Sequence, residues 1–419
     1  MTESTTTGSG PLSGLRVIEF SLLGPAAVGL HLADLGAQVI KVESPQGDYV
    51  RQMTWPIIND SSLLHWHINR GKKSITLDLR TDEGKDVFRD LVKDADAVIE
   101  AMRPGALAKR GLGYEDLKAI NPKIVFCTIS GYGMTGPYAE LPSHGIAYDT
   151  WAGLVKPEYD ENGFPGIPEH PSVGIHAGPL FGAFGLLAGV IRARETGEGC
   201  FLEIAQSDAA AAMDWYRSET WKAYERPEDE VTGNKADNYE RRAPGTAGMK
   251  DGVRYQIYES SDGHVLFMAS EQEFWKNFCE GVGRMDLFER WPGSKFADHA
   301  KGNLELRAEL VEIFKTKTTA EWVIWSGEVN TTIAPVNTPE TLAEDPQFKE
   351  RLGFMPYEGD VGAEMQPYPV KFVGEATAVP DAAPTVGEHT DEVLTSVLGY
   401  DQERIDELRR ANAFGPDGQ

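Results

Sequence analysis

The sequence predicts an α/β protein in which a large domain with a mainly parallel sheet is followed by a smaller α+β region. Two observations lead to this prediction. In the first half of the chain, short apolar segments typical of buried strands alternate with segments of helical periodicity. A polar stretch with several glycines, residues 225–250, then separates this half from a region with a different pattern.

The chain opens, after a polar tail, with a strand–helix–strand unit. Residues 15–20 form a short apolar run that ends before Gly24 and Pro25, and residues 26–35 carry leucines near helical spacing. Residues 39–43 form the second strand, so we expect a right-handed βαβ unit.

The same alternation continues along the large domain. Residues 131–178, rich in glycine, proline and tyrosine, are expected to form a long functional loop. A ligand of such a sheet binds beyond the carboxyl ends of its strands. We expect strands at 74–79, 97–100, 124–129 and 200–206, and helices at 82–93, 114–119, 179–193 and 207–221. In the second region we expect strands at 255–258 and 264–269, helices at 271–282, 304–316 and 319–328, and a closing helix at 401–411.

Composition excludes several classes of protein. The 419 residues include 40 Lys and Arg against 65 Asp and Glu, a net charge of −25, which disfavours binding to nucleic acid or anionic lipid. The three cysteines have no metal-ligand spacing and indicate a reducing compartment. No apolar stretch approaches the length of a membrane span, and the polar N-terminus lacks the features of a secretory signal, so we expect a cytoplasmic protein.

Basic residues supply the first indication of a site. They form three groups, at residues 70–73, at Arg80 and at residues 103–110. Each group follows a predicted strand, and the carboxyl ends of parallel strands meet at one edge of a sheet. The groups therefore suit an anion with several phosphates, although a solvated charged surface explains the same pattern. The sequence has no glycine-rich dinucleotide motif, Walker loop or serine-hydrolase elbow.

Two histidines are candidates for chemistry, and either can instead be structural. His144 lies among small residues in the long loop, where an imidazole can reach a ligand. His176 precedes the apolar helix, and because helix N-termini favour negative charge, a thioester oxygen or a carboxylate fits beside it. A further pair, His65 and His67, alternates on a possible strand, but no third ligand is evident, so no metal site is predicted.

Eight stretches of the sequence resemble the class III CoA-transferases, the family that includes formyl-CoA transferase, carnitine CoA-transferase and α-methylacyl-CoA racemase. They follow the family's order from about residue 11 to residue 412, which is nearly the whole chain. The stretches are PLSGLRVIEF, ADLGAQVIKVESPQGD, NRGKKSITLDLRTDEGK, IEAMRPGALAKRGLGYEDL, ISGYGMTGPY, TGEGCFLEIAQSD, APVNTPETLAEDPQF and APTVGEHTDEVLTSVLGY.

The resemblance implies an architecture and a ligand. A large Rossmann-like domain would be built from both chain ends, residues 11–224 and 336–419, with a small α+β domain at 225–335. Two chains would interlock as a dimer, with active sites between one chain and its partner. CoA or acyl-CoA would bind as a substrate and not as a tightly held cofactor. By motif position, the residues expected to contact it are Leu77, Asp78, Leu79, Arg80, Ala101, Met102, Arg103, Lys109, Ser143 and His144.

The sequence departs from the family at the position where the chemistry starts. Family transferases carry a nucleophilic aspartate shortly before the helix that leads to the TG-x-G motif, and it attacks the thioester so that one transfer becomes two easier steps. Here that position falls on Ile175, and the nearest upstream carboxylate is Glu169. Isoleucine cannot be a nucleophile, so the remaining catalytic candidates are His144, Glu169 and His176.

Three explanations follow from this departure. The chain can be the non-catalytic subunit of a heteromeric CoA-transferase, as in the succinyl-CoA:benzylsuccinate type, with the aspartate on a paralogous partner. It can be a racemase or isomerase, for which the resemblance places His144 at the histidine base but Gly174 at the required aspartate. Alternatively, Glu169 or His176 can replace the nucleophile through a shifted loop. A CoA-binding regulator without turnover is an alternative of a different class.

The identity of the acceptor acid is not specified by the sequence. Aromatic residues that could line an aryl pocket can equally belong to a packed core. These residues are Trp151, Phe164, Phe181, Trp215 and Tyr216.

Overall fold

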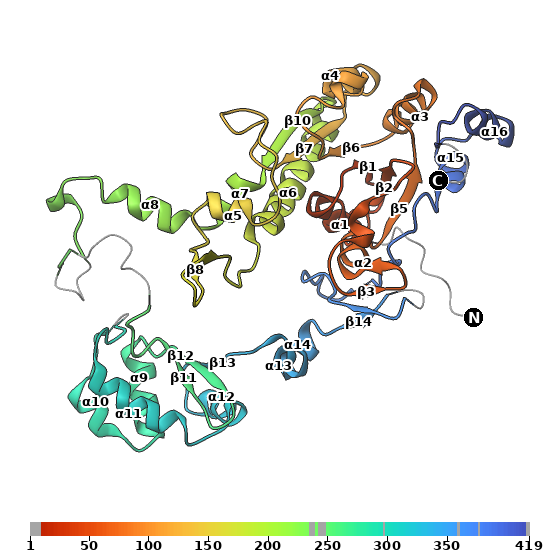
Figure 1. Ribbon diagram of the computed structural model, residues 1–419. Helices are drawn as coiled ribbons and strands as arrows, with labels where there is room; N and C mark the ends of the chain where they lie inside the picture. Colours follow the sequence, from red (N-terminus) through yellow and green to blue (C-terminus); the bar gives the residue numbers. More distant parts are fainter. Residues whose placement is uncertain are drawn as a thin grey trace. The chain divides into compact units, whose positions relative to one another are not determined.

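The computed structural model describes residues 10–233, 239–241, 249–295, 298–357, 361–375 and 378–415. The chain divides into two compact units, which Figure 1 shows coloured along the sequence. Unit 1 comprises Met1–Asp214 and Leu352–Gln419, and unit 2 comprises Trp215–Arg351. The boundaries between the two domains that the sequence predicts follow residues 224 and 335.

The sheet of unit 1 has six parallel strands in the order β10-β7-β6-β1-β2-β5. The expected α/β class with a parallel sheet is thereby confirmed. From β1 the strands are added in one direction as far as β5, and from β6 they are added in the other direction as far as β10. The order therefore reverses between β1 and β6. The strands are β1 (Arg16–Phe20), β2 (Gln38–Glu43), β5 (Lys72–Thr76), β6 (Ala97–Glu100), β7 (Val125–Ser130) and β10 (Cys200–Ala205).

Helices cover both faces of this sheet. Successive strand residues point to opposite faces, so Ile18 and Val98 pack in one core with residues from α3, α4, α15 and α16, whereas Val17 and Ala97 pack in another with α1 and α6. The described helices of unit 1 are α1 (Ala27–Ala33), α2 (Leu63–Asn69), α3 (Asp82–Lys93), α4 (Tyr114–Ile120), α5 (Ala147–Trp151), α6 (Val173–Thr196), α7 (Gln206–Met213), α15 (Thr390–Ser396) and α16 (Gln402–Arg410).

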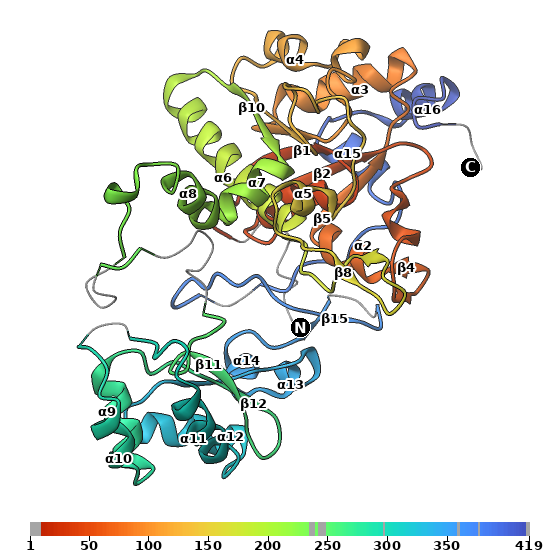
Figure 2. The ribbon, with the colours of Figure 1, turned by 60° about the vertical axis from the view of Figure 1, so that its left-hand side comes forward.

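The C-terminal segment returns to the edge strand of this sheet. The His389 amide donates to the carbonyl of Ser74 (2.9 Å), and the Asp78 amide donates to the carbonyl of Ala413 (2.7 Å). Figure 2 shows α15 and α16, in blue, on the same side of the sheet as α3. The end of the chain thus holds the segment that leaves β5.

Short elements complete unit 1. They include three two-stranded hairpins and several 3-10 turns. The hairpins pair β3 (Ile57–Ile58) with β4 (Ser61–Ser62), β8 (Glu158–Tyr159) with β9 (Pro165–Gly166), and β14 (Met355–Pro356) with β15 (Glu364–Met365). The 3-10 turns are η1 (Gly24–Ala26), η2 (Tyr49–Gln52) and η3 (Ala108–Arg110).

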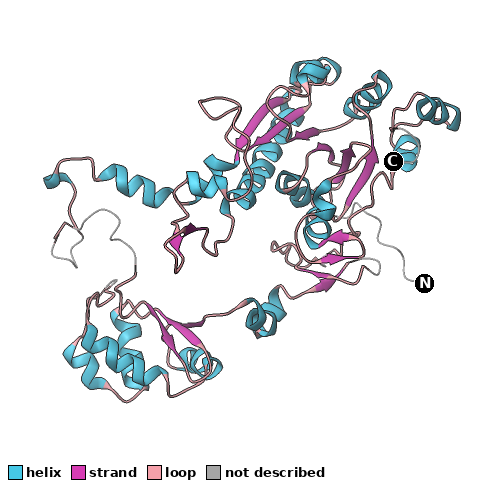
Figure 3. Cartoon of the chain, in the orientation of Figure 1, coloured by secondary structure: helices cyan, strands magenta, loops and turns pink. Residues whose placement is uncertain are grey.

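Unit 2 packs helices against a three-stranded antiparallel sheet, as the colouring in Figure 3 shows. Its core is strongly aromatic, and rings of Phe267, Phe278 and Phe314 contact one another with centroids 4.6–5.5 Å apart. The elements are α8 (Trp215–Ala223), η4 (Glu228–Glu230), β11 (Gln256–Glu259), β12 (His264–Phe267), α9 (Gln272–Gly281), α10 (Met285–Arg290), α11 (Leu304–Phe314), α12 (Thr319–Glu328), β13 (Ile333–Pro335), α13 (Pro339–Glu344) and α14 (Pro346–Arg351).

Three segments differ from expectation for identifiable reasons. His65 and His67 lie on helix α2 and not on a strand, because the Ser62 hydroxyl accepts the His65 amide (3.1 Å) and caps a helix. The expected helix at 207–221 is divided into α7 and α8 at Asp214. The helix expected from residue 179 begins at Val173, because the chain tolerates Pro179 inside α6 instead of at its start.

Helix α6 changes one further expectation. It is 24 residues long and apolar enough to cross a membrane by length and composition, and half of its most apolar stretch is buried within the unit. The sequence predicts an apolar helix at 179–193, shorter than a membrane span, whereas the helix begins at Val173 and ends at Thr196. A mostly buried core helix of a soluble protein meets the same criterion.

Candidate active site

The reversal of strand order between β1 and β6 marks the place where a sheet of this kind binds its ligand. The segments after these two strands lie side by side, since the Ala101 amide donates to the carbonyl of Phe20 (3.3 Å). Helix α6 contributes the facing wall. A β-carbon built on Gly24 would lie 3.5 Å from Cβ of Ile175. The loop after β1 and position 175 therefore meet at the reversal point.

A buried carboxyl group fixes the segment after β6. Glu100 accepts the Met102 amide (2.8 Å) and the Thr128 hydroxyl (2.6 Å), and burial raises the pKa of its carboxyl group. Arg103 and Lys109, which follow, are exposed. Neither makes an ion pair within the described part of the chain, so both cations are available to an anionic ligand.

The segment after β5 carries an ion pair between two neighbouring residues, unlike the segment after β6. Leu77, Asp78 and Leu79 are buried, whereas the Arg80 side chain is 71% exposed. The Asp78 carboxylate accepts two hydrogen bonds from the Arg80 guanidinium (2.8 and 2.7 Å), which lower the pKa of Asp78. One of the three cations expected to bind phosphate, Arg80, is therefore already paired with a neighbouring carboxylate.

Strand order separates the expected CoA contacts into two places. Strands β1 and β2 lie between β5 and β6, so three spacings of about 4.8 Å put the two segments about 14 Å apart. Ser143 lies near the segment that follows β6, at the end of the adjacent strand β7. A β-carbon built on Gly131, the first residue after β7, would lie 2.1 Å from the hydroxyl oxygen of Ser143. The next residue, His144, is exposed. Arg103 and Ser143 thus stand at the ends of adjacent strands.

The first basic group of the sequence does not belong to this edge. Arg70, Lys72 and Lys73 stand at the beginning of β5 and not at its end. Arg70 forms a two-point ion pair with Asp34 (2.9 and 2.7 Å), and Lys72 is buried against Glu19. The expectation that residues 70–73 bind phosphate is therefore wrong, because opposite charges far away in the sequence neutralise them.

Position 175 is the third residue of α6. The Ile175 side chain is half-buried and faces Gly24. The amide oxygen of Gln206, buried and without a hydrogen-bond partner, lies within 3.9 Å of the same built β-carbon. Pro179 has no N–H to donate to the carbonyl of Ile175 four residues earlier. An unpartnered amide oxygen and an apolar side chain therefore meet at Gly24.

A carboxylate that the sequence reading missed caps this helix. Asp149, fully buried in the middle of α5, accepts hydrogen bonds from the amides of Val173 (2.8 Å) and Gly174 (2.7 Å) and lies 3.3 Å from Nε2 of His170. It occupies the place of a side-chain cap, which the residue before the helix does not supply. No local signal predicts the pairing, because Asp149 is more than twenty residues upstream in the stretch read as a loop.

The three catalytic candidates are dispersed. Glu169 is exposed and precedes α6, and His144 is exposed in the loop after β7. His176 lies inside the helix and not before it, is exposed, and points about 100° away from Ile175 around the helix axis. The structure therefore shows no direct replacement for a carboxylate at position 175 among these residues.

Two further histidines lie near α6. His31 on α1 and His67 on α2 are largely buried, and burial together with the positive charge of Arg70 lowers the pKa of each to about 4. Both imidazoles are thus neutral at physiological pH. In the part of the chain that the structure describes, no three His, Cys, Asp or Glu side chains are placed to hold a metal ion.

The aromatic residues offered for an aryl pocket are not part of a packed core. All five are exposed, by between 42% and 68% of their surface, which removes the alternative that they fill an interior. Trp151 belongs to a cluster around Tyr132, whose ring lies 6.4 Å from it.

Comparison with known proteins gives the family. The model of CoA-transferase family III matches residues 12–390. Succinyl-CoA:glutarate CoA-transferase of Homo sapiens is 29% identical over 411 residues, which cover 96% of this chain and 89% of that protein. Succinate–glutarate CoA-transferase of Agrobacterium fabrum is 30% identical, with 92% of this chain and 96% of that protein covered. The chain belongs to CoA-transferase family III.

Solved structures agree with this assignment. A CAIB/BAIF family protein from Brucella suis has a TM-score of 0.74 at 28% identity, with 93% of this chain and 99% of that chain covered. An aspartate-to-alanine variant of Rv3272 from Mycobacterium tuberculosis has a TM-score of 0.73 at 27% identity, with 92% and 99% covered.

Proposed function

We propose that this chain is a subunit of a class III CoA-transferase that moves CoA from an acyl-CoA, such as succinyl-CoA, to a carboxylic acid, and that a paralogous partner subunit supplies the nucleophilic aspartate. The observation that carries the proposal is Ile175 at the reversal point of the sheet, packed against Gly24 where the reaction requires a carboxylate. The names of the relatives from Homo sapiens and Agrobacterium fabrum support a dicarboxylic donor and acceptor.

The chemistry explains why the carboxylate is indispensable. It attacks the thioester carbonyl, the CoA thiolate leaves, and a mixed anhydride forms. The thiolate then attacks the enzyme's side of the anhydride, which releases the donor acid and leaves an enzyme-bound CoA thioester. The acceptor acid reverses both steps. A hydrocarbon side chain at position 175 can form neither intermediate.

Two alternatives have less support from the geometry. A racemase needs an aspartate at Gly174, yet a β-carbon there would lie 2.8 Å from Cβ of Tyr148 and 3.0 Å from the carbonyl of Gln206. Replacement of the nucleophile by Glu169 or His176 requires an exposed side chain to approach the loop after β1.

The CoA-binding part of the proposal assigns roles to the strand ends. Arg103 and Lys109, exposed and unpaired in the described structure, would bind phosphate groups, and Ser143 with His144 would line the neighbouring strand end. Arg80 would contribute only where a ligand phosphate competes with Asp78 for its guanidinium. The remaining expected contacts, Leu77, Leu79, Ala101 and Met102, would act through their backbone or apolar surface.

The outer face of α6 supports a partner chain. The helix is apolar all round, as helices buried on every side are, but Phe184 and Ile191 are 67% and 61% exposed. A second CoA-transferase chain, interlocked with this one, would cover this face. An aromatic acceptor acid and a cytoplasmic location complete the proposal.

The test compares the chain alone with the chain co-expressed with a paralogue that has aspartate at the position of Ile175. We expect CoA transfer from succinyl-CoA only from the complex. Robust transfer by the purified chain alone would refute the heteromer. Calorimetric titration with CoA separates both enzyme forms from a protein that does not bind CoA, and a complex that binds CoA without turnover would indicate the regulator.

A further inference from the structure

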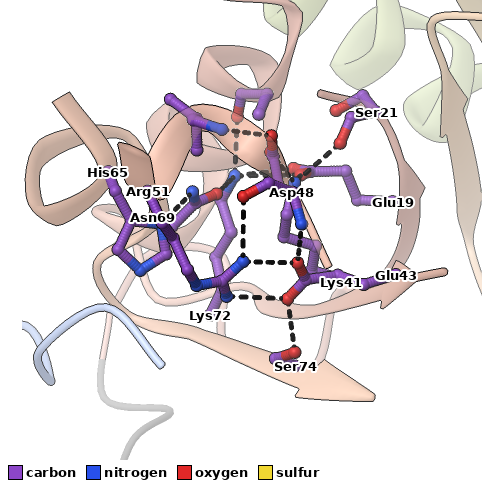
Figure 4. A network of polar contacts seen from close by, with 12 residues as sticks. Glu19, Ser21, Lys41, Glu43, Asp48, Arg51, His65, Asn69, Lys72 and Ser74 are labelled. Atoms are coloured by element: carbon purple, nitrogen blue, oxygen red, sulfur yellow. Dashed lines mark hydrogen bonds and ion pairs between the residues drawn. The ribbon is translucent and has the colours of Figure 1, made fainter. Parts of the chain in front are cut away.

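A network of buried charges lies beneath the loop after β1, as Figure 4 shows. Its charged members, here called the charge network, are buried or nearly so and come from β1, β2, β5 and the segment that follows β2. Three carboxylates face three cations, so the network carries no net charge when all six groups are ionised. The six residues are Glu19, Lys41, Glu43, Asp48, Arg51 and Lys72.

Two lysines of the network share one carboxylate. Nζ of Lys72 lies 2.8 and 3.1 Å from the two carboxylate oxygens of Glu19, and Nζ of Lys41 lies 3.4 Å from one of them. A β-carbon on Gly29 would lie 1.9 Å from Oε2 of Glu19, so helix α1 packs directly on this carboxylate. The Glu19 carboxylate is therefore buried and enclosed on the side of α1.

Each lysine also donates to the backbone of the loop. Lys41 donates to the carbonyl of Ser21 (2.6 Å), and Lys72 donates to the carbonyl of Ala26 (2.7 Å). The segment Ser21–Ala26 is thus tied at both ends, through two ammonium groups, to the single carboxylate of Glu19. Figure 4 shows Ser21 and both lysines around this point.

The tied segment needs such support. Leu23 within it has φ 55° and ψ −144°, a conformation that residues with a side chain rarely adopt and that persists only when the surroundings enforce it. The next residue, Gly24, is the one that faces Ile175. Any displacement of the segment therefore changes the wall around position 175, which in the proposed heteromer lines the site that the partner's aspartate serves.

We propose that Glu19, Lys41 and Lys72 are positioning residues that clamp the segment Ser21–Ala26 against the first turn of α6 and so set the geometry of acyl transfer. Buried ion pairs contribute little net stability compared with apolar packing of the same volume. A role in geometry accounts for the presence of six buried charges at this place. The catalytic part of this inference rests on the proposed function.

The test removes the shared carboxylate and the Lys72 arm of the clamp without leaving a buried charge unpaired. The double variant Glu19→Gln with Lys72→Met keeps two carboxylates and two cations in the network and leaves the bond from Lys41 to the Ser21 carbonyl in place. Lys73→Met is the matched control, since Lys73 is the next residue of β5 but pairs with Glu392 near the surface. Far-UV circular dichroism checks that each variant is folded.

Hydrogen exchange followed by mass spectrometry reads the clamp directly and does not depend on any activity. In the double variant we expect the amides of residues 22–24, 26 and 27 to exchange at least tenfold faster, while β2 and β7 are unchanged and the control matches the wild type. Unchanged exchange at these amides in the folded double variant would overturn the clamp.

The catalytic part is measured in the complex with the aspartate-bearing paralogue. We expect kcat to fall about tenfold in the double variant while KM for the acyl-CoA stays within twofold. Faster exchange with unchanged kcat would overturn the link to acyl transfer. If neither wild-type nor variant complex transfers CoA, the proposed function fails, and the exchange data still decide whether the clamp exists.

Discussion

The Glu19→Gln substitution tests the electrostatic argument about unit 1 most sharply. The amide is nearly isosteric with the carboxylate, so it changes charge without creating a cavity. It leaves three buried cations facing two carboxylates. The glutamine NH2 would also stand where Lys72, which has only donors, now donates at 2.8 Å.

The magnitude follows from the number of partners lost. Removing one partner of a buried ion pair costs about 3–5 kcal/mol, and here two ammonium groups lose the same partner. We therefore expect the free energy of exchange of the β1 and β2 amides to fall by about 4 kcal/mol, a large share of the stability of a typical domain. Native-state hydrogen exchange measures it.

The controls separate burial from charge. Glu392→Gln removes the surface pair with Lys73 and should cost less than about 1 kcal/mol. The double variant Glu19→Gln with Lys72→Met should recover most of the loss, because the charges balance again. A cost below about 1 kcal/mol for Glu19→Gln alone would show that the network is hydrated, and the reasoning would be wrong.

Further predictions concern pH, the helix cap and CoA. His31 and His67 have a pKa of about 4 in the folded chain against 6.5 in the unfolded chain, so the unfolded chain binds more protons between these two values. The free energy of unfolding is therefore highest above pH 6.5 and should fall by about 2 kcal/mol per histidine by pH 5, as measured by urea titrations. A free energy of unfolding that does not change between pH 7 and pH 5 would contradict this. Asp149→Asn should cost about 1–2 kcal/mol, because one buried amide of α6 loses its acceptor; an unchanged melting temperature would argue against the cap. Arg103→Ala should weaken CoA binding about tenfold by calorimetry, whereas Lys118→Ala on α4 should leave it unchanged, and equal effects would remove Arg103 from the site.

Local patterns predicted the elements of the sheet well. The alternation of apolar runs and helical periodicity placed the strands around residues 16–20, 39–43 and 125–129, and helix α3 falls on the expected residues 82–93. These assignments succeed because each depends on periodicity within a short window. The family was also recognisable, since its motifs are spread along the chain.

Contacts between segments that are far apart in the sequence could not be predicted from local patterns. The reading of residues 70–73 as a phosphate site failed because Lys72 meets Glu19, which lies 53 residues earlier, inside the sheet. Asp149 was missed because its partners are the first amides of a helix whose start had been placed six residues too late, at Pro179. Strand order, which separates the two groups of expected CoA contacts, depends on crossovers that composition does not encode.

The central claim is that this chain has no nucleophile of its own for the thioester. Mass spectrometry of the intact chain after incubation with succinyl-CoA measures this directly, because an enzyme-bound thioester adds one CoA less one water and is released by hydroxylamine. We predict no adduct on the wild-type chain alone and a hydroxylamine-sensitive adduct on Ile175→Asp, whose carboxylate would stand at the N-terminal end of α6. A hydroxylamine-sensitive CoA adduct on the wild-type chain would contradict the account.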